Sequence, residues 1–197
     1  MRIVIPADRP KCEMPLPDGS IVTLSPVLKT DREFFEQGMR ELSPESRFAR
    51  FGQGVGNLSQ QELDYLTDVD QRSHVAWGAA IVDEVAGAGR YIVQDEGRSA
   101  EVAVTVLDHM QRRGVGRALF QALAAIARHD GLRELCFEAQ ADHEAVLSLV
   151  REVEITPLVS HGMIEKRIRL ASIPTDDHDD ELVDVIEEVR RSRSERA

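Results

Sequence analysis

The sequence predicts an α/β (α+β) fold in which a mixed central β-sheet carries helices on both faces. A strand, a helix and a strand follow one another over residues 99–140, and such a βαβ unit has parallel strands and a right-handed crossover. The strands that flank this unit are joined by short turns, which favour antiparallel pairing. The apolar content of 42% and the charged content of 30% are ordinary for a globular protein.

The first half of the chain combines short strands with helices that have recognisable N-caps. Thr30 or Asp31 is placed to cap one helix and Ser43 the next, while Ser59 and Glu62 form a capping box for a third. Alternating β-branched residues mark the strands. The expected elements are a strand at 19–27, helices at 30–42, 43–51 and 58–66, and strands at 74–82 and 90–95 joined by a Gly-containing turn.

The second half begins with the βαβ unit. Its helix has an apolar stripe at three- and four-residue spacing, and Gly131 is placed to end it. The stripe consists of Val115, Ala118, Leu119, Ala122, Leu123 and Ile126. The expected elements are strands at 99–107 and 132–140 around a helix at 115–129, then a helix at 142–153 and a strand at 162–170.

The composition changes after Leu170. A polar, acidic stretch leads into residues 181–193, where acids come first and arginines last, as the helix dipole favours. A helix of this length is marginal alone, so we expect its apolar stripe (Leu182, Val185, Ile186 and Val189) to pack against the domain or, in a homodimer, against a second subunit. The predicted organisation is an N-terminal extension at 1–18, one domain at 19–172, and an acidic linker with an amphipathic helix at 173–197.

Charge and composition argue against several classes of protein. A formal net charge of −11 disfavours nucleic-acid binding, which needs basic surface to neutralise phosphates. No apolar run approaches the ~20 residues that span a bilayer, and no segment is typical of a signal peptide. Cys12 and Cys136 have no neighbours at metal-ligand spacing, which favours a reducing, cytoplasmic setting. The acids at 177–181 fit a helix start, and no metal is expected.

A basic, glycine-punctuated turn lies within VLDHMQRRGVGRALFQAL at residues 106–123. Three arginines surround Gly114 and Gly116, with no acid among them. A strand that ends in such a turn and opens a helix presents free backbone N–H groups, the positive end of a helix dipole and a close backbone approach. These features bind phosphate, and arginines add bidentate contacts. The residues predict a pyrophosphate cradle; a glycine-containing connection with solvated arginines is the alternative.

The turn fits one of three phosphate motifs. A P-loop needs Gly-Lys-Ser/Thr, and a dinucleotide fingerprint needs glycine or alanine where Leu119 stands. The pattern Q/R-x-x-G-x-G/A fits residues 111–116, and here the sequence resembles the GNAT superfamily of acetyl-CoA-dependent N-acetyltransferases. The preceding AEVAVTVLD looks like that family's fourth strand, and LSPESRFARFG with the segment after it is similar to the Pat-like branch. The resemblance covers about residues 20–170 and implies the GNAT fold with a β-α-β acetyl-CoA-binding core.

The resemblance also implies where acetyl-CoA would bind. The pantetheine would lie along the backbone of Val104, Thr105 and Val106, as an added strand does. His143 stands where relatives often carry an asparagine that contacts the cofactor. The residues implied around the pyrophosphate are Gln111, Arg112, Arg113, Gly114, Val115, Gly116, Arg117 and Ala118.

Acyl transfer to an amine also needs a base. A lysine amine, with a pKa of ~10.4, is mostly protonated at neutral pH, so a carboxylate or a water chain must take its proton. Glu101 is the candidate, because similar AE(V/I) strands in protein-acetylating relatives carry their general base there; a solvent-facing strand glutamate is the alternative. His74 is expected to pack or cap rather than to line the acceptor pocket. Strand alternation puts Glu101, Ala103, Thr105 and Leu107 on one face of the sheet.

Two features depart from the family pattern. Many relatives use a tyrosine on the helix after the fifth strand as general acid, but the only tyrosines are Tyr65 and Tyr91. Relatives often close that helix with Gly-Phe, where this chain has Glu154-Ile155. The expected function is direct acetyl transfer from acetyl-CoA to a protein lysine or a small-molecule amine. The alternative is a non-catalytic acyl-CoA-binding regulatory module.

Overall fold

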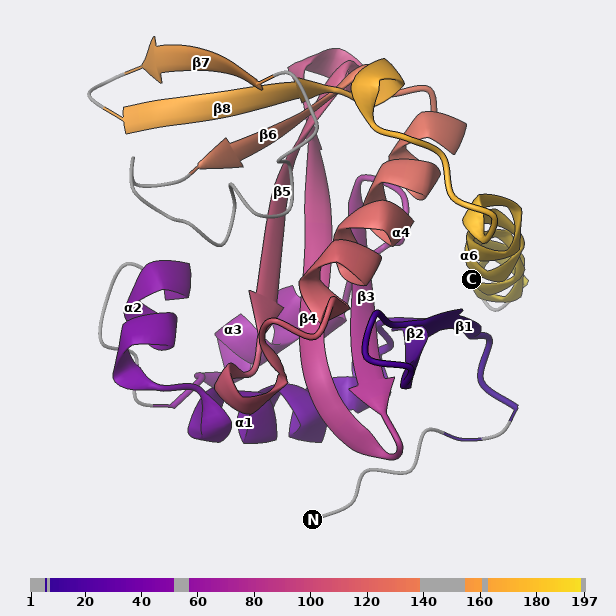
Figure 1. Cartoon of the computed structure of the whole chain (residues 1–197). Coiled ribbons are helices and arrows are strands. Elements are labelled where there is room, and N and C mark those ends of the chain that lie inside the picture. The colour runs from indigo at the N-terminus through magenta and orange to yellow at the C-terminus, as the bar shows by residue number, and fades with distance from the viewer. Residues whose placement is uncertain (1–5, 7, 52–56, 139–154, 161–162, 196–197) are drawn as a thin grey trace.

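The computed structural model describes residues 6, 8–51, 57–138, 155–160 and 163–195 and contains one mixed sheet (Figure 1). The strand order is β1-β2-β3-β4-β5-β6-β8-β7, and β5 and β6 form the one parallel pair among these neighbours. The predicted βαβ unit is therefore confirmed. The strands are β1 (Cys12–Pro15), β2 (Ile21–Pro26), β3 (His74–Ile81), β4 (Glu84–Gln94), β5 (Ser99–Val106), β6 (Glu134–Glu138), β7 (Ile155–Ser160) and β8 (Met163–Arg169).

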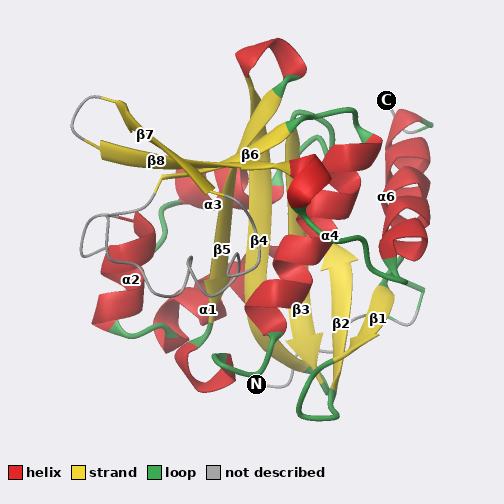
Figure 2. Ribbon diagram, turned by 45° about the horizontal axis from the view of Figure 1, so that its top comes forward, coloured by secondary structure: helices red, strands yellow, loops and turns green. Residues whose placement is uncertain are grey.

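Helices cover both faces of the sheet, as the sequence predicts. α4 crosses one face over β3, β4 and β5, with α6 beside it, whereas α1 and α3 lie on the opposite face (Figures 1 and 2). None of the helices within the described residues has the length and apolar character that crossing a bilayer demands. The helices are α1 (Arg32–Glu41), α2 (Pro44–Phe51), α3 (Gln60–Thr67), α4 (Val115–His129) and α6 (Asp179–Ser194).

The core lies mainly between α4 and the sheet. All six residues of the predicted α4 stripe are buried, and Trp77 of β3 and Tyr91 of β4 are fully buried. Gly131 ends α4 as expected: it has a φ of 80°, and its N–H donates to Arg128 O at 3.0 Å. The next amide, of Leu132, donates to Ala127 O at 3.0 Å, which completes a Schellman cap.

The strands differ from the prediction in three places. Residues 12–15, inside the predicted N-terminal extension, form the edge strand β1 and pair with β2. The β3–β4 turn consists of Val82 (φ 46°) and Asp83 (φ 62°), so the expected Gly-containing turn is wrong and those glycines lie inside β4. A Cβ on Gly87 would stand 2.4 Å from Thr105 O, so this glycine is needed for close strand pairing. β7 was not expected, and the predicted helix at 142–153 lies outside the described residues.

α1 begins after Asp31, as the sequence predicts, but the side chain of Asp31 has another role. Asp31 is the N-cap residue, but its carboxylate makes no capping bond to the helix. It binds the guanidinium of Arg9 (Nη1–Oδ1 2.7 Å) and the amide of Leu28 (2.8 Å) instead. The side chains of Arg9 and Asp31 are 6% and 5% exposed, so this buried ion pair joins the N-terminal segment to the entry of α1.

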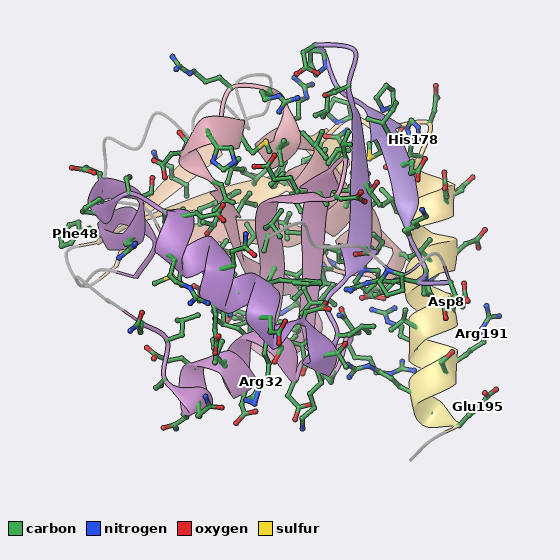
Figure 3. All side chains as sticks on the ribbon, turned by 90° about the horizontal axis from the view of Figure 1, so that it is seen from below. Asp8, Arg32, Phe48, His178, Arg191 and Glu195 are labelled. Carbon is green, nitrogen blue, oxygen red and sulfur yellow. The ribbon has the colours of Figure 1, made fainter. Side chains whose placement is uncertain are left out.

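The C-terminal segment forms a 16-residue helix, α6, that packs on its own domain. It contacts α4, β1 and β2, and in Figure 2 it stands alongside α4. Arg191 and Glu195 point away from the sheet in Figure 3, so the polar side of α6 faces solvent. The predicted stripe is confirmed as buried: Leu182 is 0%, Val185 8%, Ile186 0% and Val189 5% exposed.

Candidate functional site

The parallel strands β5 and β6 part after a short ladder. Their pairing covers only Ser99–Glu101 on β5 with Glu134–Cys136 on β6, although β5 continues to Val106. No described strand pairs with the remainder of β5 on this side, and the two strands diverge in Figure 1. Among the described residues, the backbone edge of Val102 to Val106 therefore has no partner strand on the side of β6; we call this the open β5 edge and the space beside it the gap.

The backbone direction along this edge follows from the β4–β5 pairing. The amide of Leu107 donates to Ala86 O on β4 at 2.9 Å, and in an antiparallel ladder alternate residues face the same neighbour. The backbone groups of Thr105 therefore face β4, while those of Val102 and Val104 face the gap. Val106 faces the gap as well, but its carbonyl already accepts a hydrogen bond from Gln111 Nε2 at 3.2 Å.

The basic turn lies at the lower end of this gap, between β5 and α4 (Figure 1). Gly114 is the N-cap of α4, and its carbonyl accepts the first helical bond from the Ala118 amide at 3.0 Å. The amides of Val115 to Arg117 precede this bond and have no intrahelical acceptor. No acidic side chain stands in this first turn, so the positive helix end is available to an anion.

Two residues of the turn hold the β1–β2 hairpin. Arg113 Nε donates to Asp18 Oδ2 at 2.8 Å, and its Nη2 reaches Ser20 Oγ at 3.3 Å. Gly114 has a φ of 102°, and a Cβ there would stand 2.7 Å from Pro17 Cδ. Arg113 and Gly114 thus have structural roles that the motif did not reveal. Arg112 (φ 60°) and Arg117 are exposed around the turn.

Asp108 connects this turn to the helices on the other face. It lies between β5 and the turn, and its carboxylate accepts from Ser43 N (2.9 Å), Ser43 Oγ (2.9 Å) and Ser46 Oγ (2.8 Å). Partial burial opposes ionisation, but these hydrogen bonds outweigh it and lower the pKa of Asp108. The start of α2 and the approach to the turn are therefore one hydrogen-bonded unit.

Glu101 lies in a pocket between β4, β5 and α3. It is half-buried, and its Oε2 accepts from Gln94 Nε2 at 3.0 Å. The pocket includes Glu101 and Ala103, so it lies where the β5–β6 pairing ends and the open β5 edge begins. It contains both acidic and basic side chains. It is lined by Leu58, Glu62, Tyr65, Leu66, Arg90, Ile92, Glu101 and Ala103, and we call it the glutamate pocket.

Aromatic and basic side chains that the sequence did not indicate as site residues form part of the wall of the glutamate pocket. The Arg90 guanidinium lies 5.0 Å from the centre of the Tyr65 ring. His74 packs against the Tyr65 ring, with 5.3 Å between the ring centres, and is not among the residues that line the glutamate pocket. Pairing of Arg90 with Ala103 across β4 and β5 was the signal that could have placed Arg90 here.

The helix on which relatives carry the general-acid tyrosine lies outside the described residues, and neither Tyr65 of α3 nor Tyr91 of β4 belongs to it. Tyr91 is fully buried, and its hydroxyl donates to Asp130 Oδ2 at 2.7 Å. Burial first, and then this carboxylate, raise the pKa of Tyr91. His143 and Glu154 lie outside the described residues, and Ile155 begins β7.

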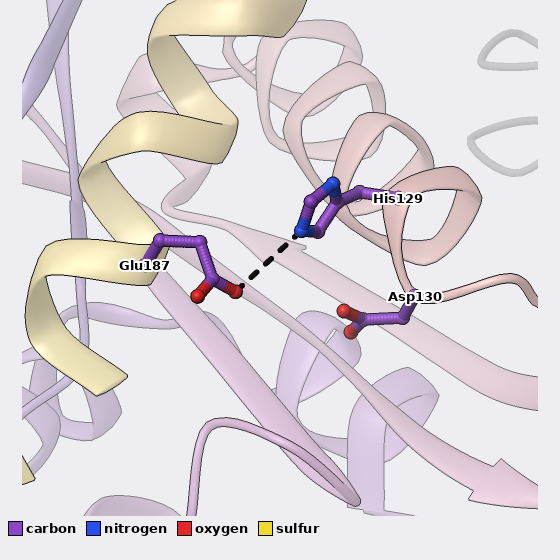
Figure 4. Close-up of side chains that lie close together, drawn as sticks. All are labelled: His129, Asp130 and Glu187. Carbon is purple, nitrogen blue, oxygen red and sulfur yellow. Dashed lines mark ion pairs between the residues drawn. The ribbon is translucent and has the colours of Figure 1, made fainter. Parts of the chain in front are cut away.

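A second cluster of potential ligands joins the end of α4 to α6. One ligand atom from each of His129, Asp130 and Glu187 lies within 4.8 Å of the others, and His129 Nε2 lies 3.5 Å from Glu187 (Figure 4). Arg190 already contacts both carboxylates, with 2.7 Å to Asp130 and 2.8 Å to Glu187. We assign this cluster to helix docking, and the absence of a metal stays a prediction.

Comparisons with known proteins agree with this architecture. Residues 36–152, more than half of the chain, match the model of the Acetyltransferase (GNAT) family. Acetyltransferase PA5475 of Pseudomonas aeruginosa is 31% identical over 138 residues, which cover 68% of this chain and 74% of that protein. Acetyltransferase Pat of Mycolicibacterium smegmatis is 28% identical over 177 residues, which cover 88% of this chain and 53% of Pat, so the chain spans about half of that relative.

A solved structure shows the same fold. The GNAT domain of S. lividans PAT superimposes with a TM-score of 0.74 at 26% identity, covering 84% of this chain and 99% of that domain. The open β5 edge, the glycine turn and the order of elements around them fit the family match. The resemblance read from residues 111–116 is thereby confirmed: the chain belongs to the GNAT family of acetyltransferases and is an acyltransferase.

Proposed function

We propose that this protein transfers an acetyl group directly from acetyl-CoA to an amine, either a protein lysine or a small-molecule amine. The observation that carries the proposal is the open edge of β5, which leads from the start of α4 to the glutamate pocket. Residues 102–106 span roughly 16 Å at about 3.3 Å per residue. One continuous track therefore joins an anion-binding helix end to a carboxylate.

In this proposal acetyl-CoA lies along that track. The amides of the glycine turn and of Val115 to Arg117 hold the pyrophosphate, with Arg112 and Arg117 beside it. The backbone of Val102 and Val104 pairs with the pantetheine amides. Gln111 supports the track indirectly, because it occupies the carbonyl of Val106.

Glu101 serves as general base in the glutamate pocket. It removes a proton from the acceptor ammonium, directly or through water, and the amine nitrogen attacks the thioester carbonyl. The new C–N bond gives a tetrahedral intermediate, and the nitrogen loses its second proton to solvent. The intermediate then collapses as the C–S bond breaks, and the departing CoA thiolate takes up a proton from solvent. The products are an amide and CoA. Glu62 and Glu101 give the pocket acidic groups that suit a cationic acceptor.

The test measures CoA release from acetyl-CoA with a panel of lysine peptides and small amines. Glu101→Gln is expected to lower kcat by about 10²–10⁴-fold and to leave the Kd for acetyl-CoA within twofold. Glu62→Gln is the matched control, since it removes a carboxylate from the same pocket without removing the proposed base. Turnover of Glu101→Gln within a few-fold of the native rate would show that another group takes the proton.

A non-catalytic acyl-CoA-binding module is the second candidate. The hydrogen bond from the Tyr91 hydroxyl to Asp130 favours this second candidate, because a hydroxyl committed to that bond does not supply a proton to the leaving thiolate. Tight acetyl-CoA binding with no CoA release from any amine in the panel would support this candidate. We also infer a cytoplasmic setting, because the two cysteines, Cys12 and Cys136, are buried and form no disulfide with each other.

A further inference from the structure

An apolar pocket adjoins the glutamate pocket on the same face of the sheet. α1 covers it, and β3, β4 and β5 form its floor. Phe35, Gly38 and Met39 line it from α1, and Ala88, Ala103 and Thr105 line it from the sheet. The small residues on the strands keep the floor low, which leaves room beneath the helix.

The interior of this apolar pocket offers little to a polar group. Its far end is lined by Arg9 and Asp31, which neutralise each other in the buried ion pair (Nη1–Oδ1 2.7 Å). Arg9 Nε is buried there without a hydrogen-bond partner among the described residues, but most of the wall is hydrocarbon, so a charged occupant would lose its hydration over most of its surface. The chemistry of the walls therefore selects a hydrocarbon.

The apolar pocket also opens where the reacting thioester would lie. It shares Leu58, Leu66, Arg90 and Ala103 with the glutamate pocket. Ala103 lies between Glu101 and Thr105 on the face of β5 that carries both pockets, next to the gap-facing backbone of Val102 and Val104. An acyl carbonyl on that edge has the acceptor base on one side and the apolar pocket on the other.

We propose that the apolar pocket binds the alkyl chain of an acyl-CoA longer than acetyl-CoA, with a straight chain of about four to six carbons. The cavity measures about 120 Å³, close to the ~150 Å³ of an apolar protein cavity that holds benzene. The proposal rests on the proposed function for the position of the CoA moiety. It adds the class of acyl donor, which the family membership leaves open.

Equilibrium binding tests the proposal without a known acceptor. The Kd values of CoA, acetyl-CoA, butanoyl-CoA and hexanoyl-CoA are measured by calorimetry. Each buried methylene contributes up to about fourfold in affinity, so hexanoyl-CoA is expected to bind at least tenfold more tightly than acetyl-CoA. Equal or weaker binding of the longer chains would overturn the proposal.

Gly38 offers a matched pair of variants outside the cofactor track and the glutamate pocket. A Cβ at Gly38 would have only Leu107 Cδ2 within 4 Å, at 3.9 Å, so alanine fits, and alanine favours the helix. Gly38→Leu fills the apolar pocket. It is expected to abolish the tighter binding of hexanoyl-CoA and to keep the Kd for acetyl-CoA within twofold of the native value. Gly38→Ala is expected to retain most of the difference between the Kd values for acetyl-CoA and hexanoyl-CoA. Thermal unfolding of both variants verifies that they fold.

The outcomes separate this proposal from the proposed function. Acetyl transfer together with equal Kd values for acetyl-CoA and hexanoyl-CoA would overturn the acyl-chain pocket and leave the proposed function standing. Tight hexanoyl-CoA binding without transfer to any amine would overturn the proposed function and leave the acyl-chain pocket standing. If Gly38→Leu raises only the KM of the acceptor amine, the apolar pocket serves the acceptor, and the proposal is wrong.

Discussion

Arg190 of α6 donates two hydrogen bonds of 2.7 Å to the carboxylate of Asp130, at the C-terminal end of α4. The Arg190 side chain is 4% exposed, and its Nε also donates to Gln71 O at 2.6 Å. Burial disfavours the charged guanidinium, but the hydrogen bonds to Asp130 and Glu187 outweigh it and raise the pKa of Arg190. Because Tyr91 of β4 donates to the same carboxylate, one acid joins α4, α6 and the sheet.

Arg190→Met should therefore destabilise the protein. Removing Arg190 leaves the part-buried Asp130 carboxylate and the Gln71 carbonyl without their donor, which costs about 1–3 kcal/mol. Urea unfolding measures this change, and Arg191→Met on the exposed side of α6 is the control, with an expected change within about 0.5 kcal/mol. Equal stability of the two variants would show that the pair contributes nothing to docking.

Removal of the chain after Leu170 should lower the melting temperature. Leu182 and Ile186 are fully buried against the domain, and truncating one such side chain to alanine costs about 2–5 kcal/mol. Acetyl-CoA affinity should stay within twofold, since α6 is not part of the cofactor track. Light scattering before and after truncation also tests the predicted homodimer. A truncated chain that melts at the native temperature would contradict the packing of α6.

Gly114→Ala should destabilise the protein more than Gly131→Ala. Both glycines have a positive φ, which costs an L-residue about 1–2 kcal/mol. Gly131 has nothing within 4 Å of a Cβ, whereas Gly114 would meet Pro17 at 2.7 Å. The difference between the two unfolding free energies isolates this clash. It should shrink when Pro17 is changed to glycine; a difference that persists would place its cause elsewhere.

Gly116→Val tests the phosphate site more cleanly than a change at Gly114. Gly116 lies in the first turn of α4 and is not among the described glycines with a positive φ, so backbone strain does not confuse the result. A valine there places a branched side chain beside the free amides, and the Kd for acetyl-CoA should rise more than tenfold. Gly116→Ala should give a smaller rise. Native affinity in a folded Gly116→Val protein would remove the turn from the cofactor site.

His74 should make stability depend on pH between about 6.5 and 4. Burial first, and the charge of Arg90 second, lower its pKa from 6.5 to about 4 in the folded state, against the opposing effect of Asp70. The unfolded chain therefore binds a proton at higher pH than the folded one, and stability is lost as the pH falls through this window. His74→Phe keeps the ring against Tyr65 and should reduce the stability lost across this pH window by an amount on the order of 1 kcal/mol after solvent screening. An unchanged slope would assign the dependence to other groups.

The sequence determined the elements whose local pattern is strong. The stripe of α4, its Schellman end at Gly131 and the capping box of Ser59 and Glu62 all form as predicted, because helix periodicity and caps depend on neighbours in sequence. The motif at residues 111–116 indicated the family for a similar reason, since a turn that binds phosphate needs particular residues at fixed spacing.

Tertiary structure decided what those patterns leave open. Arg113 and Gly114 look like phosphate residues in sequence, but Asp18 and Pro17, almost a hundred positions away, also require them. Asp31 looks like a helix cap, yet Arg9 takes its carboxylate. The apolar pocket, the Tyr65–Arg90 contact and the docking of α6 through Asp130 likewise depend on residues far apart in the chain. A one-dimensional pattern carries periodicity and local hydrogen bonding, whereas such long-range partners are fixed only when the sheet brings their elements together.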